Sequence, residues 1–327
     1  MPTAKLIFNP TAGRFASIEM IAAAAHHLES AGWQIKITQT TSRAHLTEVV
    51  RRAVQDGLDG LFVAGGDGSI QQAVAELAGS QTALGILPAG TANVLANELG
   101  LPGLTWTHRH ALQESARALA AASIQAVDVG LVNGMPFLSW AGVGLDSLIV
   151  SKMEGRRHGR RRFTTQQYIA SLLWQARSWQ GVQLTLDADG EQVSGVFSLA
   201  VVSNIRHYAG GLAQISPQAC LDDGLMDLWL FSGVSVRETL AHAWRLYLGM
   251  HFDAQQIKRI PFRQLKLAAG QPLLAQLDGD PYEFDRHVAV EVQPGALRLL
   301  VPSQAPGSLF SQPPLPPIPG IAIQAEP

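Results

Sequence analysis

The sequence predicts an α/β plus all-β chain, with a doubly wound, Rossmann-like N-terminal domain and an antiparallel β-sandwich after it. Three observations lead to this fold class. Up to about residue 125, apolar runs of strand length alternate with stretches of helical spacing. Two Gly-rich turns each follow a strand-like run and open a helix-like one. From about residue 126, short alternating runs separated by Asn133-Gly134 and Asp189-Gly190 are typical of antiparallel hairpins. Repeated strand–helix units favour a parallel sheet in the first part.

The expected elements of the first part follow one another in strand–helix order. The strands are expected at residues 5–8, 33–37, 61–64 and 83–87, and the helices at 18–28, 46–54, 70–77 and 94–99. In a sheet of this kind ligands bind at the carboxyl ends of the strands. We therefore expect Asn9, Gly65-Gly66 and Gly90-Thr91 to lie at one edge of the sheet.

The second part reads as a mostly antiparallel domain with inserted helices. Its strands are expected at residues 182–186, 195–202, 226–231, 265–268, 273–277, 288–292 and 297–301, and its helices at 163–179 and 236–251. We predict domains at 1–125 and 126–303. A Pro-rich stretch at 304–327 has the composition of a disordered tail.

An apolar stripe on the last expected helix allows two interpretations. Leu240, Trp244, Tyr247 and Leu248 recur at helical spacing. Such a stripe is more often part of a core than a surface that admits lipid, so we expect it to be buried.

Composition restricts the function classes. The chain has 327 residues and a net charge of −2, which gives no electrostatic footprint for nucleic acid. The single cysteine, Cys220, excludes an internal disulfide and fits a reducing compartment. Neither a signal peptide nor an apolar run of transmembrane length is present in this sequence. We expect a cytoplasmic protein whose membrane contact, if any, is peripheral.

The two Gly-rich turns are candidate phosphate-binding loops. They read Gly65-Gly66-Asp67-Gly68-Ser69 and Pro88-Ala89-Gly90-Thr91-Ala92-Asn93. Glycines at a strand-to-helix turn let backbone N–H groups approach a ligand, and the following helix N-terminus favours an anion. Neither a P-loop nor a Gly-x-Ser-x-Gly elbow occurs. Asp67 would repel phosphate unless a cation or a reacting proton lies between them; it could equally cap a helix.

Together these motifs resemble the diacylglycerol kinase catalytic domain, and in particular the bacterial soluble lipid kinases related to sphingosine and ceramide kinases. The resemblance rests on both Gly-rich turns and on the sequence from Asn9 to Gly13. It continues through residues 128–130, 142–146, 222–227 and 278–280, and so covers nearly all of the chain before the tail.

The resemblance implies that the first part binds ATP. The residues that it assigns to the nucleotide are Asn9, Thr40, Gly65, Gly66, Asp67, Gly68, Ser69, Gly90, Thr91 and Asn93. Ser69 replaces the more usual threonine and keeps the hydroxyl. Thr40 could also be a plain strand-end residue, and Thr91 and Asn93 could cap a helix as well as bind.

The resemblance also implies a Mg²⁺ site in the turn from Cys220 to Leu225. Asp223 would supply a carboxylate, and Cys220 and Leu225 would supply backbone carbonyls, all hard oxygen ligands of the kind that Mg²⁺ takes. Asp67 would hold a catalytic Mg²⁺ or a water network that leads to this site. An acidic turn with no metal is the alternative.

The sequence Asp278-Gly279-Asp280 occupies the place of the family's Asp-Gly-Glu, whose carboxylates deprotonate the acceptor hydroxyl. Asp280 is shorter than Glu by about one carbon–carbon bond, roughly 1.5 Å. Either Asp278 or Asp280 is the candidate base. A simple Asp-Gly hairpin turn is the alternative.

The implied activity is ATP-dependent phosphorylation of a lipid hydroxyl such as that of diacylglycerol. Five arginines between Arg156 and Arg162 could attract an anionic membrane, but they could also be solvated or contact ATP phosphates. The alternatives are a non-catalytic lipid- or nucleotide-binding regulator and an NAD kinase. The sequence leaves both the acceptor lipid and a homodimer open.

Overall fold

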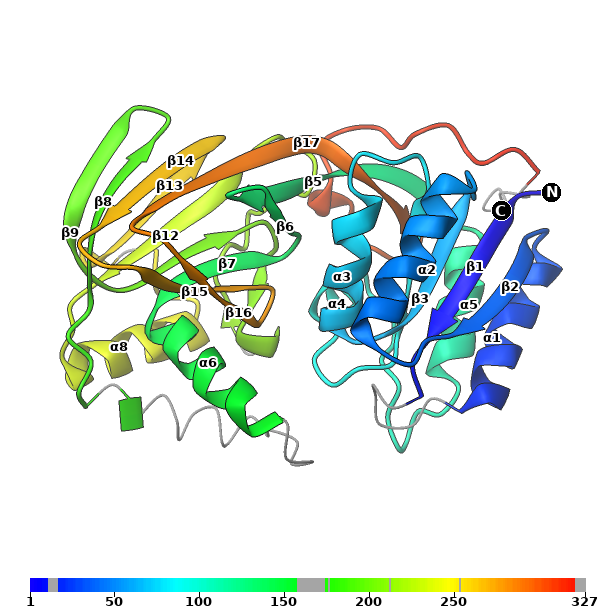
Figure 1. Cartoon of the computed structure of the whole chain (residues 1–327), viewed down its shortest axis with the longest axis horizontal. Helices are drawn as coiled ribbons and strands as arrows, with labels where there is room; N and C mark the ends of the chain where they lie inside the picture. The colour runs from blue at the N-terminus through cyan, green and yellow to red at the C-terminus, as the bar shows by residue number, and fades with distance from the viewer. Residues whose placement is uncertain (11–16, 158–173, 176, 212, 253, 321–327) are drawn as a thin grey trace. The chain divides into compact units, whose positions relative to one another are not determined.

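A computed structural model describes residues 1–10, 17–157, 174–175, 177–211, 213–252 and 254–320 of the chain (Figure 1). The chain divides into two compact units. Unit 1 comprises Met1–Val129, Cys220–Asp223 and Gln293–Pro327, and unit 2 comprises Gly130–Ala219 and Gly224–Val292. The chain thus returns to unit 1 twice after the boundary expected near residue 125.

Unit 1 is built on a parallel sheet in the order β17-β4-β3-β1-β2. Its strands are β1 (Thr3–Phe8), β2 (Gln34–Gln39), β3 (Gly60–Gly65), β4 (Ala83–Pro88), the first part of β5 (Ser123–Val132) and the last part of β17 (His287–Val301). The register pairs Phe8 with Ala64 and Gly65 with Pro88. Strands β3 and β4 are buried along their whole length, as expected for strands covered on both faces.

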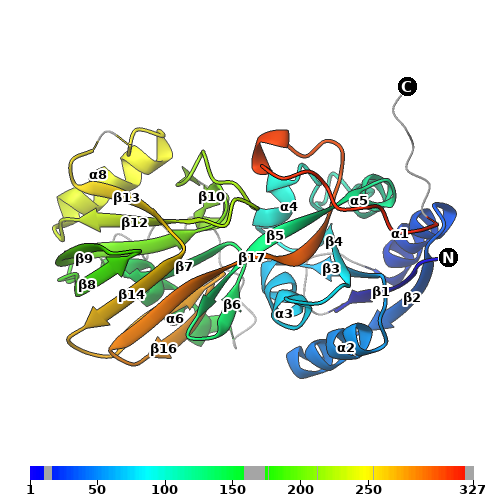
Figure 2. The same ribbon diagram turned by 90° about the horizontal axis from the view of Figure 1, so that it is seen from above.

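Helices cover both faces of this sheet. They are α1 (Ile18–Ser30), α2 (Arg43–Gln55), α3 (Asp67–Leu77), the short α4 (Val94–Glu98) and α5 (Ala111–Ala120). Figure 2 shows α1 and α5 on one face, and α2 and α3 on the other. The predicted doubly wound architecture is confirmed.

Unit 2 is an antiparallel β-domain. Its strands are β6 (Met135–Phe137), β7 (Trp140–Gly144), β8 (Val182–Ala188), β9 (Glu191–Ser203), β10 (His207–Tyr208), β11 (Ala213–Gln214), β12 (Met226–Ser232), β13 (Ile257–Phe262), β14 (Gln264–Ala269), β15 (Leu273–Leu277) and β16 (Asp280–Phe284), with the first part of β17. Strand β9 pairs with β7, β8 and β12. The buried core includes Leu184, Leu228, Phe262 and Leu265. The predicted β-sandwich is confirmed.

Three Asx-Gly turns close hairpins of unit 2 and share one backbone shape. Asn133, Asp189 and Asp278 have φ of 47°, 49° and 47°, and the glycine after each also has positive φ. Two successive positive φ values define the type I′ turn, whose twist matches that of paired strands. In each turn the Asx side chain also accepts N–H groups from a neighbouring segment.

Among its described residues, unit 2 also contains helices α6 (Leu145–Arg157) and α8 (Val236–Tyr247) and the 3-10 turn η1 (Ala209–Gly211). Most of the helix expected at 163–179 lies outside the described residues. The expectation that the apolar stripe of α8 is core is wrong. Leu240, Trp244, Tyr247 and Leu248 are exposed, whereas Thr239, His242 and Leu246 are buried. The helix packs through its smaller and more polar side. On that side the His242 ring contacts Phe231, and His242 Nε2 donates to the carbonyl of Ser232.

The expectation of a disordered tail is wrong for residues 304–320. This segment holds the 3-10 turn η2 (Gly307–Leu309), and the Leu309 side chain is fully buried. The N–H of Leu315 donates to the carbonyl of Ile124 on β5. Amino-acid composition does not predict this ordered structure, because the segment is held by contacts with residues that are distant in sequence. Residues 321–327 lie outside the described residues.

Candidate functional site

The two Gly-rich turns lie side by side at the carboxyl ends of β3 and β4. A Cβ built at Gly90 would lie 2.4 Å from Gly66 Cα, and one built at Gly66 would lie 3.1 Å from Gly90 Cα. The N–H of Ala89 donates to the carbonyl of Gly65. The two loops touch backbone to backbone, so Gly66 and Gly90 are required first for the contact between the loops.

Asp67 fastens the first loop to the second. Its Oδ2 accepts the N–H of Asn93 at 2.9 Å, and its Oδ1 accepts that of Val94 at 2.7 Å. Asp67 thus caps α4, and not its own helix. Burial raises the pKa of Asp67 above its ordinary value, and the two N–H groups offset part of that rise.

Asn93 completes this clamp from the second loop. It has φ of 48°, and its side chain accepts from Gly90 N–H and donates to the Gly90 carbonyl. Asn93 is buried, whereas Thr91 is exposed. Of these two predicted nucleotide residues, Thr91 presents its side chain to solvent and Asn93 shapes the loop.

The start of α3 has no side-chain cap. Gly66 is its N-cap residue and supplies no side-chain hydrogen bond. The amides of the first turn of a helix carry partial positive charge and bind anions. Gly68 and Ser69 lie in this first turn, half-exposed. This is the feature of unit 1 that fits a phosphate group.

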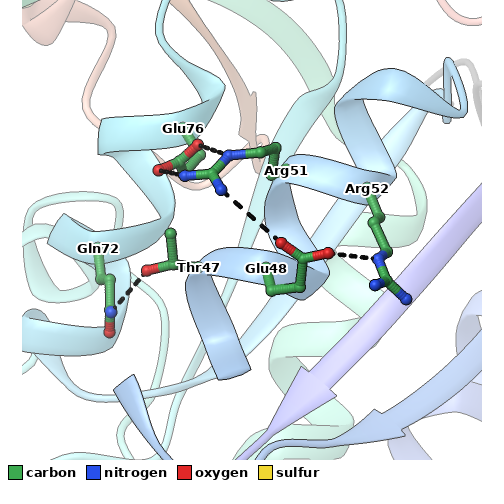
Figure 3. A network of polar contacts seen from close by, with 6 residues as sticks. All are labelled: Thr47, Glu48, Arg51, Arg52, Gln72 and Glu76. Atoms are coloured by element: carbon green, nitrogen blue, oxygen red, sulfur yellow. Dashed lines mark hydrogen bonds and ion pairs between the residues drawn. The ribbon is translucent and has the colours of Figure 1, made fainter. Parts of the chain in front are cut away.

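Arg43 places a cation beside that helix start. A Cβ built at Gly68 would lie 3.7 Å from Arg43 Nη2. Ion pairs hold α2, which carries Arg43, against α3: Arg51 donates through two nitrogens to Glu76 (Figure 3). Gln72 of α3 donates to Thr47 Oγ1 and to the carbonyl of Arg43. The guanidinium therefore belongs to the same edge of the sheet as the Gly-rich turns.

The remaining predicted nucleotide residues lie at the same edge. Asn9 follows β1 and is half-buried. Thr40 follows β2 and is fully buried, with its N–H and its hydroxyl both donating to the carbonyl of Phe8. Thr40 therefore joins β2 to β1, and its contact with a nucleotide stays a prediction. The rest of that first motif, from Thr11 to Gly13, lies outside the described residues.

The acidic turn is organised around Asp222. Its carboxylate accepts from Gln125 Nε2 at 2.8 Å, and also from the N–H groups of Ser311 and Gln312. Burial alone would raise the pKa of Asp222, but these donors hold it below its ordinary value. The Cys220 thiol donates to Asp222 Oδ1, and burial raises the pKa of that thiol. Cys220 is therefore a thiol, and only its carbonyl suits a hard cation.

Asp223 is the carboxylate of this turn that faces solvent. Among the described residues, no three His, Cys, Asp or Glu side chains are placed to hold a metal ion. The predicted Mg²⁺ set consists of one carboxylate and two carbonyls, and Leu225 belongs to unit 2. Cys220 and Asp223 of unit 1 fit their assigned parts in donor chemistry.

The Asp278-Gly279-Asp280 turn divides its two acids between different surroundings. Asp278 Oδ1 accepts the N–H groups of Ser139 and Trp140, and Oδ2 accepts that of Leu138 at 2.8 Å. This carboxylate fixes the segment that leads into β7. Asp280 begins β16 and is buried, with 6% of its surface exposed.

A buried polar pair lies beside this turn. Gln276 Nε2 donates to Asp146 Oδ2 at 2.9 Å, and Gln276 Oε1 accepts the N–H of Gly279 at 2.8 Å. A Cβ at Gly142 would lie 2.8 Å from Asp146 Oδ2. The Gly142-to-Asp146 motif thus supports the Asp-Gly-Asp turn.

Family models match both parts of the chain. Residues 3–132 match the diacylglycerol kinase catalytic domain, and residues 140–301 match the YegS C-terminal NAD kinase beta sandwich-like domain. The resemblance to the diacylglycerol kinase catalytic domain is thus confirmed for residues 3–132. The expected kinase phosphotransferase class is confirmed by this match and by the names of the relatives.

Relatives of this kinase match it over nearly their whole length. A diacylglycerol kinase of Bacillus subtilis is 26% identical over 300 residues, covering 89% of this chain and 96% of the relative. One of Mycobacterium tuberculosis is 29% identical over 308 residues, covering 90% and 93%. The crystal structure of a diacylglycerol kinase from Bacillus anthracis shares the fold, with a TM-score of 0.71 at 20% identity over 93% of this chain and 98% of that one.

Sequence reasoning missed Arg43 and the cross-loop hydrogen bonds of the candidate site. Arg43 sits in the same stretch as Thr40, but no spacing rule links an arginine on one helix to the start of another. The cross-loop bonds of Asp67 and Asp278 depend on loops that come together only in the fold. The Arg156–Arg162 run gives no test of its role, because residues 158–162 lie outside the described residues.

Proposed function

We propose that this protein is an ATP-dependent lipid kinase that transfers the γ-phosphate to the hydroxyl of a diacyl lipid alcohol such as diacylglycerol. The uncapped start of α3, inside a loop that Asp67 locks to its neighbour, is the observation that carries the proposal. The family match supplies the reaction class, and the names of the two relatives support the acceptor class.

Unit 1 would bind the phosphates. The first turn of α3 has no side-chain cap, and the Arg43 guanidinium lies beside Gly68. Both favour the charge that builds on phosphoryl oxygens during transfer. Because the two loops are already joined, little reorganisation is needed when the nucleotide binds.

The carbonyl of Cys220 and the carboxylate of Asp223 would hold Mg²⁺, with Leu225 as the third predicted ligand. Bound Mg²⁺ would supply positive charge that offsets the phosphate charge. Asp67 has both oxygens in hydrogen bonds to amides. Each oxygen keeps a lone pair for water, so we assign Asp67 to the water network of the site.

Unit 2 would supply the base. Asp278 accepts three N–H groups, which occupy both of its oxygens and fix its turn. We therefore assign proton abstraction to Asp280 and the positioning of its turn to Asp278. Asp146 and Gln276 hold the turn from beneath through the N–H of Gly279. An acceptor within about 3 Å of Asp280, or one water away, would then attack the γ-phosphate in line.

The test is transfer of labelled γ-phosphate from Mg²⁺-ATP to a panel of lipid alcohols in mixed micelles. We expect wild type to label diacylglycerol. We expect Asp280→Asn to lose at least about a hundredfold in rate, the usual contribution of a general base, while its melting temperature stays unchanged. Asp278→Asn should lose activity and melting temperature together, because one N–H acceptor site becomes an amide NH₂.

ATP binding without labelling of any lipid would contradict the kinase assignment and favour a nucleotide-binding regulator. Full activity of Asp280→Asn would reject Asp280 as the base. Asp280→Glu, which restores the family's residue, serves as the matched control and should remain active.

A further inference from the structure

Helix α8 and the loop after it form an exposed apolar surface. The α8 surface consists of Leu240, Trp244, Tyr247, Leu248, Met250 and Phe252, which are 43%, 63%, 66%, 47%, 62% and 45% exposed. Positions 240, 244, 247 and 248 share one helix face. Single exposed apolar residues are ordinary, but a group that includes three aromatic side chains on one helix and the loop after it marks an interaction surface.

The helix needs no further partner to be stable. Ser235 caps it, and Glu238 completes a capping box. Its inner side is buried through Thr239, His242 and Leu246. Figures 1 and 2 both draw α8 at the outer margin of unit 2. The apolar side thus stays exposed, and no packing against the described residues of the unit accounts for it.

The surface is held rigidly. The Trp244 and Tyr247 rings stack with centroids 5.9 Å apart. His251 is fully buried, and its Nε2 donates to the carbonyl of Ile215 at 2.8 Å. This contact fixes the loop between Met250 and Phe252. The Phe252 ring in turn packs on Trp229, with centroids 5.4 Å apart. Apolar groups held in place in this way lose little entropy on binding.

Charge around the α8 surface favours an anionic bilayer over a second copy of the chain. Residues 239–252 contain no Asp or Glu, and the helix carries Arg237, Glu238 and Arg245. Arg237 is exposed and Arg245 is half-buried, whereas the Glu238 carboxylate already accepts the N–H and the hydroxyl of Ser235. An isologous dimer would bring the arginines of two copies together with no carboxylate of the helix but this capping one, whereas an anionic leaflet attracts them. Tryptophan and tyrosine are also the residues that settle at the membrane–water interface.

We propose that the α8 surface docks this protein on the interface of an anionic lipid bilayer. The inference deepens the proposed function, on which it rests: a diacyl lipid acceptor resides in a bilayer, and the enzyme must be held there to reach it. The contact is interfacial. Within the described residues, no helix has both the length and the apolar character needed to cross a bilayer.

The test is co-sedimentation of the full-length protein with vesicles of phosphatidylglycerol and phosphatidylcholine, without nucleotide. We expect wild type to bind, and the double variant Trp244→Ser/Tyr247→Ser to bind at least about tenfold more weakly, since the two rings supply most of the insertable area. Trp106→Ser is the matched control, because Trp106 is 73% exposed but lies in unit 1. It should bind as wild type does.

Unchanged vesicle binding by the double variant would overturn the proposal. So would a wild-type dimer in sedimentation velocity that the double variant breaks into monomers, with no vesicle binding by either. Because binding is measured without ATP, failure of the kinase assay leaves this test intact. If the kinase assay succeeds, the double variant should lose transfer to vesicle lipid and keep transfer to a dissolved short-chain diacylglycerol.

Discussion

At the scale of single residues, three carboxylates of the candidate site form hydrogen bonds with backbone N–H groups of other segments. Asp67, Asp222 and Asp278 each accept at least two N–H groups from another segment. A short acidic side chain that reaches across a turn satisfies amides that would otherwise be buried without partners. Substitution of such residues therefore changes local geometry as well as charge.

Arg43 gives a residue-scale prediction about charge at the start of α3. Its guanidinium lies near the start of α3, and we expect Arg43→Ala to raise KM for ATP by about tenfold, the worth of one charge-assisted hydrogen bond. The melting temperature should not change, because Arg43 is exposed.

Arg52→Ala is the control for this variant. Arg52 lies on the same helix and pairs with Glu48 (Figure 3). Steady-state kinetics with varied ATP distinguish the two. Equal KM values for Arg43→Ala and wild type would remove Arg43 from the phosphate site.

Much of this site could be predicted from the sequence, and the limits are physical. Gly66 and Gly90 mark strand-to-helix turns by type and spacing, and the parallel topology then brings the turns to one edge. The reason for the glycines, a direct contact between two backbones, is invisible without the fold. Asp278-Gly279 is a type I′ turn, as its dipeptide predicts, yet the three amides that its carboxylate accepts lie 138 to 140 positions away in sequence.

At the scale of elements, α8 shows why helical periodicity alone misleads. An apolar stripe and a polar stripe are both present, and periodicity does not say which one the neighbouring strand accepts. Here the buried stripe contains His242, which finds a carbonyl of β12 and an aromatic ring of Phe231. The larger apolar stripe of α8 stays exposed.

Two buried histidines, one in α8 and one in the loop after it, predict that the stability of the fold depends on pH. His242 and His251 each donate Nε2–H to a carbonyl, and their Nδ1 atoms have no hydrogen-bond partner among the described residues. Burial lowers the pKa of both rings below the ordinary 6.5. The folded state therefore binds a proton less readily than the unfolded chain. The stability from these neutral rings is fully present above about pH 6.5 and is lost as the pH falls below it.

We expect the melting temperature to fall from pH 7.5 to pH 5.5. Each histidine removes up to about 1.4 kcal/mol of unfolding free energy for each pH unit below its unfolded pKa. His251→Gln keeps a donor for Ile215 and should flatten the profile. His45→Gln, at a half-exposed site in unit 1, is the control. Parallel profiles for wild type and His251→Gln would contradict the assignment to His251.

At the scale of the whole molecule, the C-terminal segment packs against unit 1. Residues 304–320 return to unit 1, where Leu309 is buried and Asp222 receives the N–H groups of Ser311 and Gln312. The N–H of Leu221 donates to the carbonyl of Leu309 at 2.8 Å. The acidic turn next to the proposed Mg²⁺ ligand Asp223 is thus held from one side by the C-terminal segment.

This closure predicts that the C-terminal segment stabilises both unit 1 and the proposed metal turn. A chain that ends after Ser303 should melt several degrees lower, and Leu309→Ala should lose about 2–5 kcal/mol of stability, as for other fully buried leucines.

If Mg²⁺ raises the melting temperature of the full chain, that rise should shrink in the shortened chain, because Asp222 would lack its backbone donors. Ser303→Ala, at an exposed position, should melt as wild type does. Calorimetry with and without Mg²⁺ measures all of these, and a shortened chain as stable as the full one would show that residues 304–320 contribute nothing to the fold.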